Sequence, residues 1–358
     1  MIRVLELSGD PRHMGRQHGE QVADQRPLIE ADMQHRLAVV RQAGHDWRPA
    51  LAKLLRSWQR HAPATLEMLR GMAEALRFSW EDYLLHNAAA YLTSRLSLVD
   101  PGEAGCTTWA ANGRLTADGA PLLAKNRDQA PDELALQCLA RVRPVRGYPY
   151  LCLTSAGSPA VYSSGINAAG LAVVDTHVPA TIVGPGITRY SLMMDLLEQC
   201  ADVPTAILLL STVPHMGNGT LTLADAQGNL AVFEIAHLAQ VVIRPADDFV
   251  ISTNHFVAAA TQLYCVDDEP PPLRGNSLER RRQVEAALRG ARGQVDLAWS
   301  QRLMAQHGNG PAAICRHREI DPNKVTISAA VYSPCGTSVH VTEGNPCQAS
   351  LEAFQVEA

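Results

Sequence analysis

The spacing of apolar residues predicts helices in the first quarter of the chain. Apolar side chains recur three and four residues apart in two stretches, which is the period of a helix with one buried face. They are Leu51, Leu54, Leu55 and Trp58 in one stretch and Leu66, Leu69, Ala73 and Leu76 in the other. Ser79, followed three residues later by Asp82, is the capping pattern that opens a further helix. Residues from about 10 to 98 are therefore expected to be helical.

The pattern changes after a turn-rich break at residues 100–105. Beyond it short apolar runs dominate, and Asn112-Gly113 and Asp118-Gly119 are typical of hairpin turns. Strands are predicted at residues 151–153, 170–174, 220–223, 230–235, 241–252, 325–332 and 338–341, and helices at 190–200, 205–211, 278–288 and 298–306. Helices first and then strands in hairpin order favour segregated layers over a doubly wound sheet. The pattern fits an α+β fold with two antiparallel sheets covered by helices.

Composition narrows the class of protein. The chain has 358 residues, 46% of them apolar, and a formal net charge of −5. This charge argues against a nucleic-acid partner held by a basic field. No apolar run approaches the ~18 residues that a membrane span needs, and the first residues lack the apolar stretch of a secretory signal. We expect no membrane partner and a cytoplasmic location.

The common cofactor and metal motifs are missing from the sequence. No lysine follows a glycine, which excludes a phosphate-binding loop of the Walker type, and there is no GxGxxG, HExxH or GxSxG. The eight cysteines form no CxxC pair and show no zinc spacing with histidine, so reduced thiols are expected. His13, His18 and His317 lack the spacing and carboxylate neighbours of a metal site. The sequence predicts neither a cofactor nor a metal.

Cys106 is the residue most informative about chemistry. It follows Gly105 where the break ends and the first predicted strand begins. Cys106 is either a buried thiol of the core or a catalytic nucleophile. If the bond between Gly105 and Cys106 is cut, Cys106 carries both a thiol and a free α-amine, whose unperturbed pKa of ~7.7–8 suits a base near neutral pH. Glycine before the cut leaves its carbonyl uncrowded for attack by the thiol.

Six short motifs lie in order along nearly the whole chain. They are Gly9-Asp10-Pro11 with Gly15, His18 and Gly19; Gly105-Cys106-Thr107-Thr108; Lys125-Asn126-Arg127-Asp128; Gly165-Ile166-Asn167-Ala168-Ala169-Gly170-Leu171-Ala172; Thr253-Asn254-His255; and Ile314-Cys315-Arg316. Together they resemble the penicillin acyltransferase family of cysteine N-terminal-nucleophile (Ntn) hydrolases, which includes isopenicillin-N acyltransferase. Choloylglycine hydrolases and acid ceramidase are more distantly similar.

The resemblance implies a fold and a maturation step. The fold is a four-layer αββα sandwich with an N-terminal helical segment, in agreement with the layers expected from the pattern. The implied precursor cuts itself before Cys106, which yields a helical α part of residues 1–105 and a β part of residues 106–358 carrying the Ntn core. The two fragments are expected to stay together as one folded unit.

The resemblance also assigns roles to individual residues. Cys106 matches the nucleophile, Asp128 the carboxylate that orients its amine, and Asn254 an oxyanion-hole donor. Arg316 matches an arginine near the active site, which holds either a substrate carboxylate or an internal acid. His255 follows Asn254 in its motif and is a candidate substrate contact.

Two departures from the family pattern leave alternatives open. Arg127 stands where relatives carry an aromatic residue, and Lys125 precedes the Asn of the motif. These charges either lower the thiol pKa or select an anionic substrate, or the side chains point into solvent. Asp175 and His177 either line the substrate pocket or occupy a polar sheet edge. The run Arg280-Arg281-Arg282 is interpreted as a solvated helix face.

Three functions remain open on this reasoning. The leading one is hydrolysis of a small N-acyl amine, amino acid or peptide-like compound through a Cys106 thioester. The second is acyl transfer from a thioester such as acyl-CoA, or from an amide, to an amine, as in penicillin biosynthesis. The third is a non-catalytic binding protein on the same scaffold.

Overall fold

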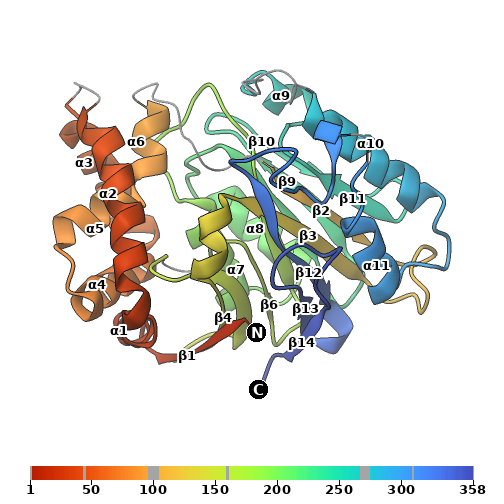
Figure 1. Cartoon of the computed structure of the whole chain (residues 1–358), viewed down its shortest axis with the longest axis horizontal. Helices are drawn as coiled ribbons and strands as arrows, with labels where there is room; N and C mark the ends of the chain where they lie inside the picture. The colour runs from red at the N-terminus through yellow and green to blue at the C-terminus, as the bar shows by residue number, and fades with distance from the viewer. Residues whose placement is uncertain are drawn as a thin grey trace.

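The computed structural model describes residues 2–42, 46–95, 105–158, 161–266, 275–308 and 310–357. Over these residues the chain forms two sheets stacked face to face with helices on both outer sides (Figure 1). Of the turn-rich break predicted at 100–105, only Gly105 lies among the described residues, and the helical prediction for 96–98 also lies outside them. No described helix is long and apolar enough to cross a bilayer.

The N-terminal part consists of one strand followed by a stack of helices. The helices are α1 (Pro11–Gln21), α2 (Arg26–Gln42), α3 (Arg48–His61), α4 (Pro63–Leu76), α5 (Trp80–Asn87) and α6 (Ala89–Arg95). They confirm the helical prediction, and Ser79 caps α5 by accepting a hydrogen bond from the Asp82 backbone N–H. The strand β1 (Arg3–Gly9) was missed. It pairs in parallel with β4 (Gln137–Pro144), so the segment before Gly105 is not purely helical.

Glycines allow α1 and α4 to pack with their backbones in contact. A Cβ atom on Gly15 would lie 2.1 Å from the carbonyl oxygen of Met68, and one on Gly71 would lie 2.1 Å from that of Arg12. Neither distance leaves room for a side chain. Gly15 of the N-terminal motif therefore has a packing role. It lets α1 pack closely against α4, next to the sheet edge formed by β1.

The larger sheet carries the N-terminal helices on its outer face. Its strands run in the order β1, β4, β5 (Tyr150–Ser155), β6 (Ser164–Asn167), β7 (Ala172–His177), β8 (Gly219–Ala224), β9 (Leu230–Ile235) and β10 (Gln240–Ile243). All neighbours except β1 and β4 are antiparallel. The helices α7 (Arg189–Gln199) and α8 (Val203–Thr212), both predicted, share the apolar layer on this outer face with α1 to α6.

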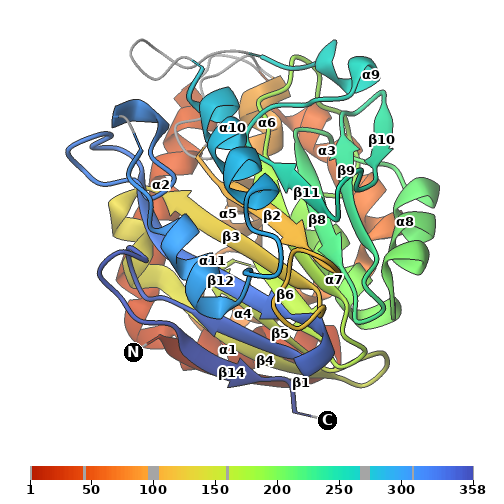
Figure 2. The ribbon, with the colours of Figure 1, turned by 90° about the vertical axis from the view of Figure 1, so that its right-hand side faces the viewer.

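The smaller sheet carries the C-terminal helices. Its order is β11 (Phe249–Ser252), β2 (Thr107–Ala111), β3 (Leu122–Gln129), β12 (Val325–Ser333), β13 (Ser338–Val341) and β14 (Glu352–Gln355). The single strand predicted at 241–252 is wrong, because β10 ends in one sheet and β11 begins in the other. Figure 2 shows α10 (Asn276–Arg289) and α11 (Leu297–Met304) lying over this sheet. A short helix, α9 (Ala259–Gln262), precedes them.

Strand alternation separates the layers. On β2, Trp109 and Ala111 pack outward against α10 and α11, whereas Ala110 packs inward against the larger sheet. Thr108 also points inward, and its hydroxyl lies 2.9 Å from that of Thr222 on β8. An apolar layer between the sheets and one outside each of them make the four-layer αββα arrangement that was predicted.

Candidate active site

Cys106 lies immediately before β2, a central strand of the smaller sheet. The thiol is buried, and burial raises its pKa, while the ammonium of Lys125 opposes this rise. Gly105 has a φ of +157°, and a Cβ atom there would lie 2.7 Å from the Cβ of Asp128. Only glycine fits between Cys106 and this carboxylate. The fold thus brings the cysteine and Asp128 together.

Asp128, near the end of β3, is fully buried. Its Oδ1 accepts a hydrogen bond of 2.7 Å from the Thr326 hydroxyl on β12. Its Oδ2 lies 3.6 Å from Nε of Arg316 and accepts no hydrogen bond from the described residues. Burial raises the Asp128 pKa, and the charges of Arg316 and Arg280 oppose this effect. Arg316 also lies 3.5 Å from Asp321, so it pairs with internal acids.

Asn254 follows β11 and is held by two polar contacts. Its Nδ2 donates to the carbonyl oxygen of His177 at 2.8 Å, and its Oδ1 accepts from Nη2 of Arg280 at 2.7 Å. Arg280 also donates to the Cys106 carbonyl oxygen at 2.7 Å. One arginine therefore connects the candidate nucleophile with the candidate oxyanion donor.

The interpretation of residues 280–282 as a solvated face is wrong for Arg280. Arg282 is exposed, but Arg280 is completely buried, and its Nε donates to Asn276 at 2.6 Å. Arg281 is partly buried and donates to the Ile251 carbonyl oxygen. A charge run on a helix gives no sign of which member faces the sheet. The apolar residues Val284 and Leu288, at i+4 and i+8 from Arg280, were the available signal, because they mark the same buried face.

We expect Arg280→Met to destabilise the fold as well as the site. The substitution leaves the Cys106 carbonyl, the Thr107 hydroxyl and the Asn254 amide oxygen without a buried donor. Each unpaired buried acceptor costs about 1–3 kcal/mol, so a loss of at least about 3 kcal/mol is expected. Urea unfolding measures it, with exposed Arg282→Met as the control. Equal stability of the two variants would contradict the role of Arg280.

Lys125 and Arg127 do not point into solvent. The Lys125 ammonium is buried and lies 2.5 Å from Asp175 and 3.1 Å from the Ser163 carbonyl oxygen. Asp175 also pairs with Arg189 of α7 at 3.2 Å. Arg127 donates to the Ser155 hydroxyl at 2.7 Å and lies over the Tyr162 ring. Internal ion pairs therefore compensate the charges of Lys125 and Asp175, whereas Arg127 is held by neutral internal partners.

Both candidate histidines adjoin Asn254, His177 through a hydrogen bond and His255 as the next residue in the chain. His177 ends β7, and its carbonyl oxygen accepts the Asn254 amide hydrogen bond. His255 contacts the Ser277 hydroxyl through Nδ1 at 2.7 Å. Burial, with the nearby charges of Arg281 and Arg280, lowers the His255 pKa to about 4. His255 is therefore neutral near pH 7 and carries no charge for a substrate carboxylate.

A cavity lies between the N-terminal helices and the larger sheet. Its lining includes Trp58, His86, Tyr162, Arg189 and Met216. Tyr162 stacks on Arg127, and Arg189 pairs with Asp175, so the cavity adjoins the buried charges beside Lys125. The sequence pattern did not indicate this space, because helices and strands far apart in the chain enclose it.

Comparison with known proteins places this architecture in a class of enzyme. The sequence model of the acyl-coenzyme A:6-aminopenicillanic acid acyl-transferase family matches residues 115–348, and the chain belongs to this family. This family is named for an acyl-transferase, and the chain is therefore classed as an enzyme. Membership of an enzyme family argues against the non-catalytic alternative. The matched residues include Asp128, Asn254 and Arg316 and begin after Cys106.

Solved structures show more distant likenesses. A single-residue variant of conjugated bile acid hydrolase from Clostridium perfringens is 12% identical, with a TM-score of 0.48 over 70% of this chain and 97% of that one. Penicillin V acylase from Agrobacterium tumefaciens is 15% identical, with a TM-score of 0.47 over 66% of this chain and 83% of that one. The Caenorhabditis elegans N-acylethanolamine-hydrolyzing acid amidase ortholog is 18% identical, with a TM-score of 0.46 over 64% of this chain and 93% of that one. No curated protein sequence matches the chain significantly.

Proposed function

We propose that the protein cuts itself between Gly105 and Cys106 and then hydrolyses a small N-acyl compound through a thioester on Cys106. The observation that carries this proposal is the placement of Asp128. Its Oδ2 is buried, receives no hydrogen bond from the described residues, and lies where a Cβ on Gly105 would approach to 3.1 Å. A buried acceptor of this kind is costly unless a partner arrives. The α-amine released from Cys106 would supply that partner.

The self-cleavage step uses the same thiol as the later reaction. The Cys106 sulfur attacks the Gly105 carbonyl carbon, the peptide C–N bond breaks, and the nitrogen takes up a proton to become the Cys106 α-amine. Water then hydrolyses the resulting thioester, leaving a carboxylate on Gly105 and a free thiol. We propose that residues 1–105 remain in place afterwards. The β1–β4 pairing and the apolar layer shared by α1 to α6 and the larger sheet support this.

In the mature enzyme each residue acts on a defined atom. The α-amine accepts the thiol proton, and the thiolate attacks the acyl carbonyl carbon, while the positive charge of Lys125 favours the thiolate. The Asn254 Nδ2 carries two N–H donors, one of which is used on His177. We propose that the second stabilises the tetrahedral oxyanion. The leaving amine takes the proton, and water completes the hydrolysis.

Substrate contacts are proposed beside these groups. The cavity next to Arg127 and Asp175 has an apolar part at Trp58 and Met216, which suits an acyl chain. Arg127, Asp175 and Arg316 have internal partners, so we assign them to shaping and charging the site rather than to binding a free carboxylate. His177 and His255 adjoin Asn254 and are proposed to border the amine side of the substrate.

Acyl transfer is the second candidate, because the family to which the chain belongs is described by that reaction. Transfer uses the same thioester, and an amine instead of water attacks it. The test supplies an acyl-CoA with 6-aminopenicillanic acid in one reaction and N-acyl amines of increasing chain length in another. Amine release without an acceptor supports hydrolysis, and acylated acceptor supports transfer. If neither product forms with fully cleaved protein, the proposed function is wrong.

The function proposed here implies no nucleic-acid partner and no metal in the chemical step. The cytoplasmic location stays a prediction, and fractionation of the expressing cells tests it.

We expect Asp128→Asn to move the acidic limb of the pH–activity profile to lower pH. The Asp128 charge favours the ammonium form of the Cys106 amine, so its removal lowers the amine pKa, and the amine is then a free base at lower pH. The amine and thiol titrate as a pair, so the limb belongs to both. The measurement is kcat/KM against pH on fully cleaved protein.

Asp321→Asn is the matched control, because Asp321 pairs with the same Arg316 on its other side. The limb of that variant should stay close to the wild-type position. If both variants shift the limb equally, or neither does, Asp128 is not coupled to the nucleophile.

A further inference from the structure

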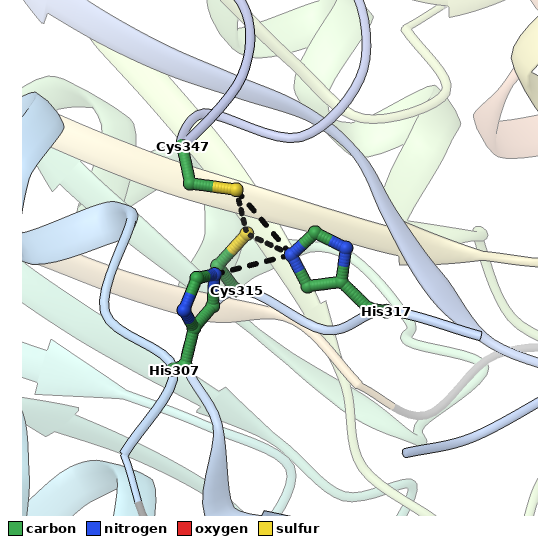
Figure 3. Close-up of side chains that lie close together, drawn as sticks. All are labelled: His307, Cys315, His317 and Cys347. Atoms are coloured by element: carbon green, nitrogen blue, oxygen red, sulfur yellow. Dashed lines mark hydrogen bonds between the residues drawn. The ribbon is translucent and has the colours of Figure 1, made fainter. Parts of the chain in front are cut away.

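Two cysteines and two histidines converge on one point outside the candidate active site. They are His307, Cys315, His317 and Cys347, and one ligand atom from each lies within 4.8 Å of all the others (Figure 3). The sequence shows no zinc spacing of cysteine with histidine, and His317 was not expected to be a ligand. The group forms only in the folded chain, so spacing along the sequence could not indicate it. The expectation of no metal stays a prediction, and the proposal below departs from it.

The distances between the four side chains match a tetrahedral zinc centre. Bond lengths of about 2.3 Å to sulfur and 2.0–2.1 Å to nitrogen place two sulfurs about 3.8 Å apart, sulfur and nitrogen about 3.6 Å apart, and two nitrogens about 3.3 Å apart. The two sulfurs are 3.7 Å apart, and the two Nε2 atoms 3.1 Å apart. From His317 Nε2, the Cys315 and Cys347 sulfurs lie at 3.6 and 3.3 Å. These four distances fit four of the six edges of the tetrahedron, and the two remaining edges, from His307 to the sulfurs, are no longer than 4.8 Å.

The surroundings of the cluster suit thiolate ligands. Asn345 donates from Nδ2 to the Cys315 sulfur at 3.4 Å and to the Arg316 carbonyl oxygen at 2.7 Å. Hydrogen bonds of this kind orient metal ligands and stabilise their charge. Cys315 is buried, whereas His307 and Cys347 are exposed, so an ion can enter from solvent. The set of two thiolates and two imidazoles is typical of zinc.

The four residues join three loops of the C-terminal part. His307 follows α11, Cys315 and His317 precede β12, and Cys347 follows β13. Arg316 stands between two of them, and its guanidinium lies beside Asp128. An ion bound by the four side chains would therefore tie the segment that carries Arg316 to two neighbouring loops.

We propose that His307, Cys315, His317 and Cys347 bind one Zn²⁺ ion as a closed structural site that fixes the segment carrying Arg316. Four protein ligands leave no position for water or substrate, which distinguishes structural from catalytic zinc. Binding releases the two thiol protons to solvent, and no electron is transferred. None of its ligands takes part in the proposed acyl chemistry, so zinc binding can be tested separately from that reaction.

The experiment uses the purified full chain, with reductant present and later removed. The protein is incubated with zinc chloride alone and desalted, and its metal is measured by mass spectrometry. We expect about one zinc per chain. Cys347→Ser and His307→Ala should each lose most of it. The exposed residues Cys335 and His35 provide matched controls, and Cys335→Ser and His35→Ala should retain the metal.

Two further readouts do not depend on the variants. Co²⁺ in place of zinc should give the intense visible bands of a tetrahedral site and a thiolate-to-metal charge-transfer band. Zinc should raise the Tm of the wild-type chain and the control variants, but not that of the ligand variants.

Three results would overturn the proposal. The first is wild-type protein that retains no more zinc than Cys347→Ser. The second is an octahedral Co²⁺ spectrum without a thiolate band. The third is a Cys315–Cys347 disulfide, seen by peptide mapping in reductant-treated protein that has taken up no metal. Acylase activity enters none of these readouts, so a failure here leaves the proposed function standing, and the reverse also holds.

Discussion

Cys106→Ala is expected to yield a single uncut chain without amidase or acyl-transfer activity. Alanine has no sulfur to attack the Gly105 carbonyl and none to hold the acyl group, so both reactions lose their nucleophile. The loss in kcat is expected to be on the order of 10⁶, as for removal of a catalytic nucleophile elsewhere. The intact mass of the purified protein and amine release from one good substrate measure the two effects.

Two companion variants sharpen this result. Cys335→Ser removes an exposed thiol and should be cut and active like the wild type. Cys106→Ser retains an attacking oxygen, but a hydroxyl is a weaker nucleophile than a thiol, so slow or absent cleavage is expected. Full activity of uncut Cys106→Ala would exclude Cys106 as the nucleophile. Rapid maturation of Cys106→Ser would show that the thiol is not required.

Asn254→Ala is expected to be processed but to lose about 10²–10³ in kcat. The proposed N–H donor acts on the tetrahedral state and adds little to ground-state binding, so KM should change far less. Steady-state kinetics on one substrate separate the two constants. A raised KM with unchanged kcat would move Asn254 from the oxyanion hole to the binding pocket.

The control for Asn254→Ala must separate the loss of the N–H donor from the loss of the hydrogen bond between Asn254 and Arg280. Asn276 holds the same guanidinium from the other side, through a hydrogen bond of 2.6 Å to Nε. Asn276→Ala therefore loosens Arg280 without touching the proposed donor, and its kcat should stay within about tenfold of the wild-type value. An equal loss of kcat in Asn276→Ala and Asn254→Ala would assign both effects to the position of Arg280.

The local pattern of apolar residues was sufficient to predict most helices and several strands. The helices α4, α7 and α10 bury a face whose residues recur every three or four positions, and this period can be read from the sequence. The strand predicted at 241–252 failed for a different reason. The segment does contain two apolar runs that form strands. Asp248 adopts a positive φ of 62° between them, and β10 and β11 pair with different sheets. Pairing partners are not visible in a local pattern.

The sequence by itself determined the layered class of the fold and, through ordered motifs, the family. The same motifs single out Cys106, Asp128 and Asn254 as candidate site residues. Tertiary structure decided which charges are buried and what they hold. Arg280 connects Cys106 with Asn254, and Lys125 pairs with Asp175, because α10 and strands of both sheets bring these buried side chains together. The group of His307, Cys315, His317 and Cys347 likewise depends on three loops meeting. Periodicity reports contacts within an element, whereas a site joins residues far apart in the chain, and only folding sets the distances between them.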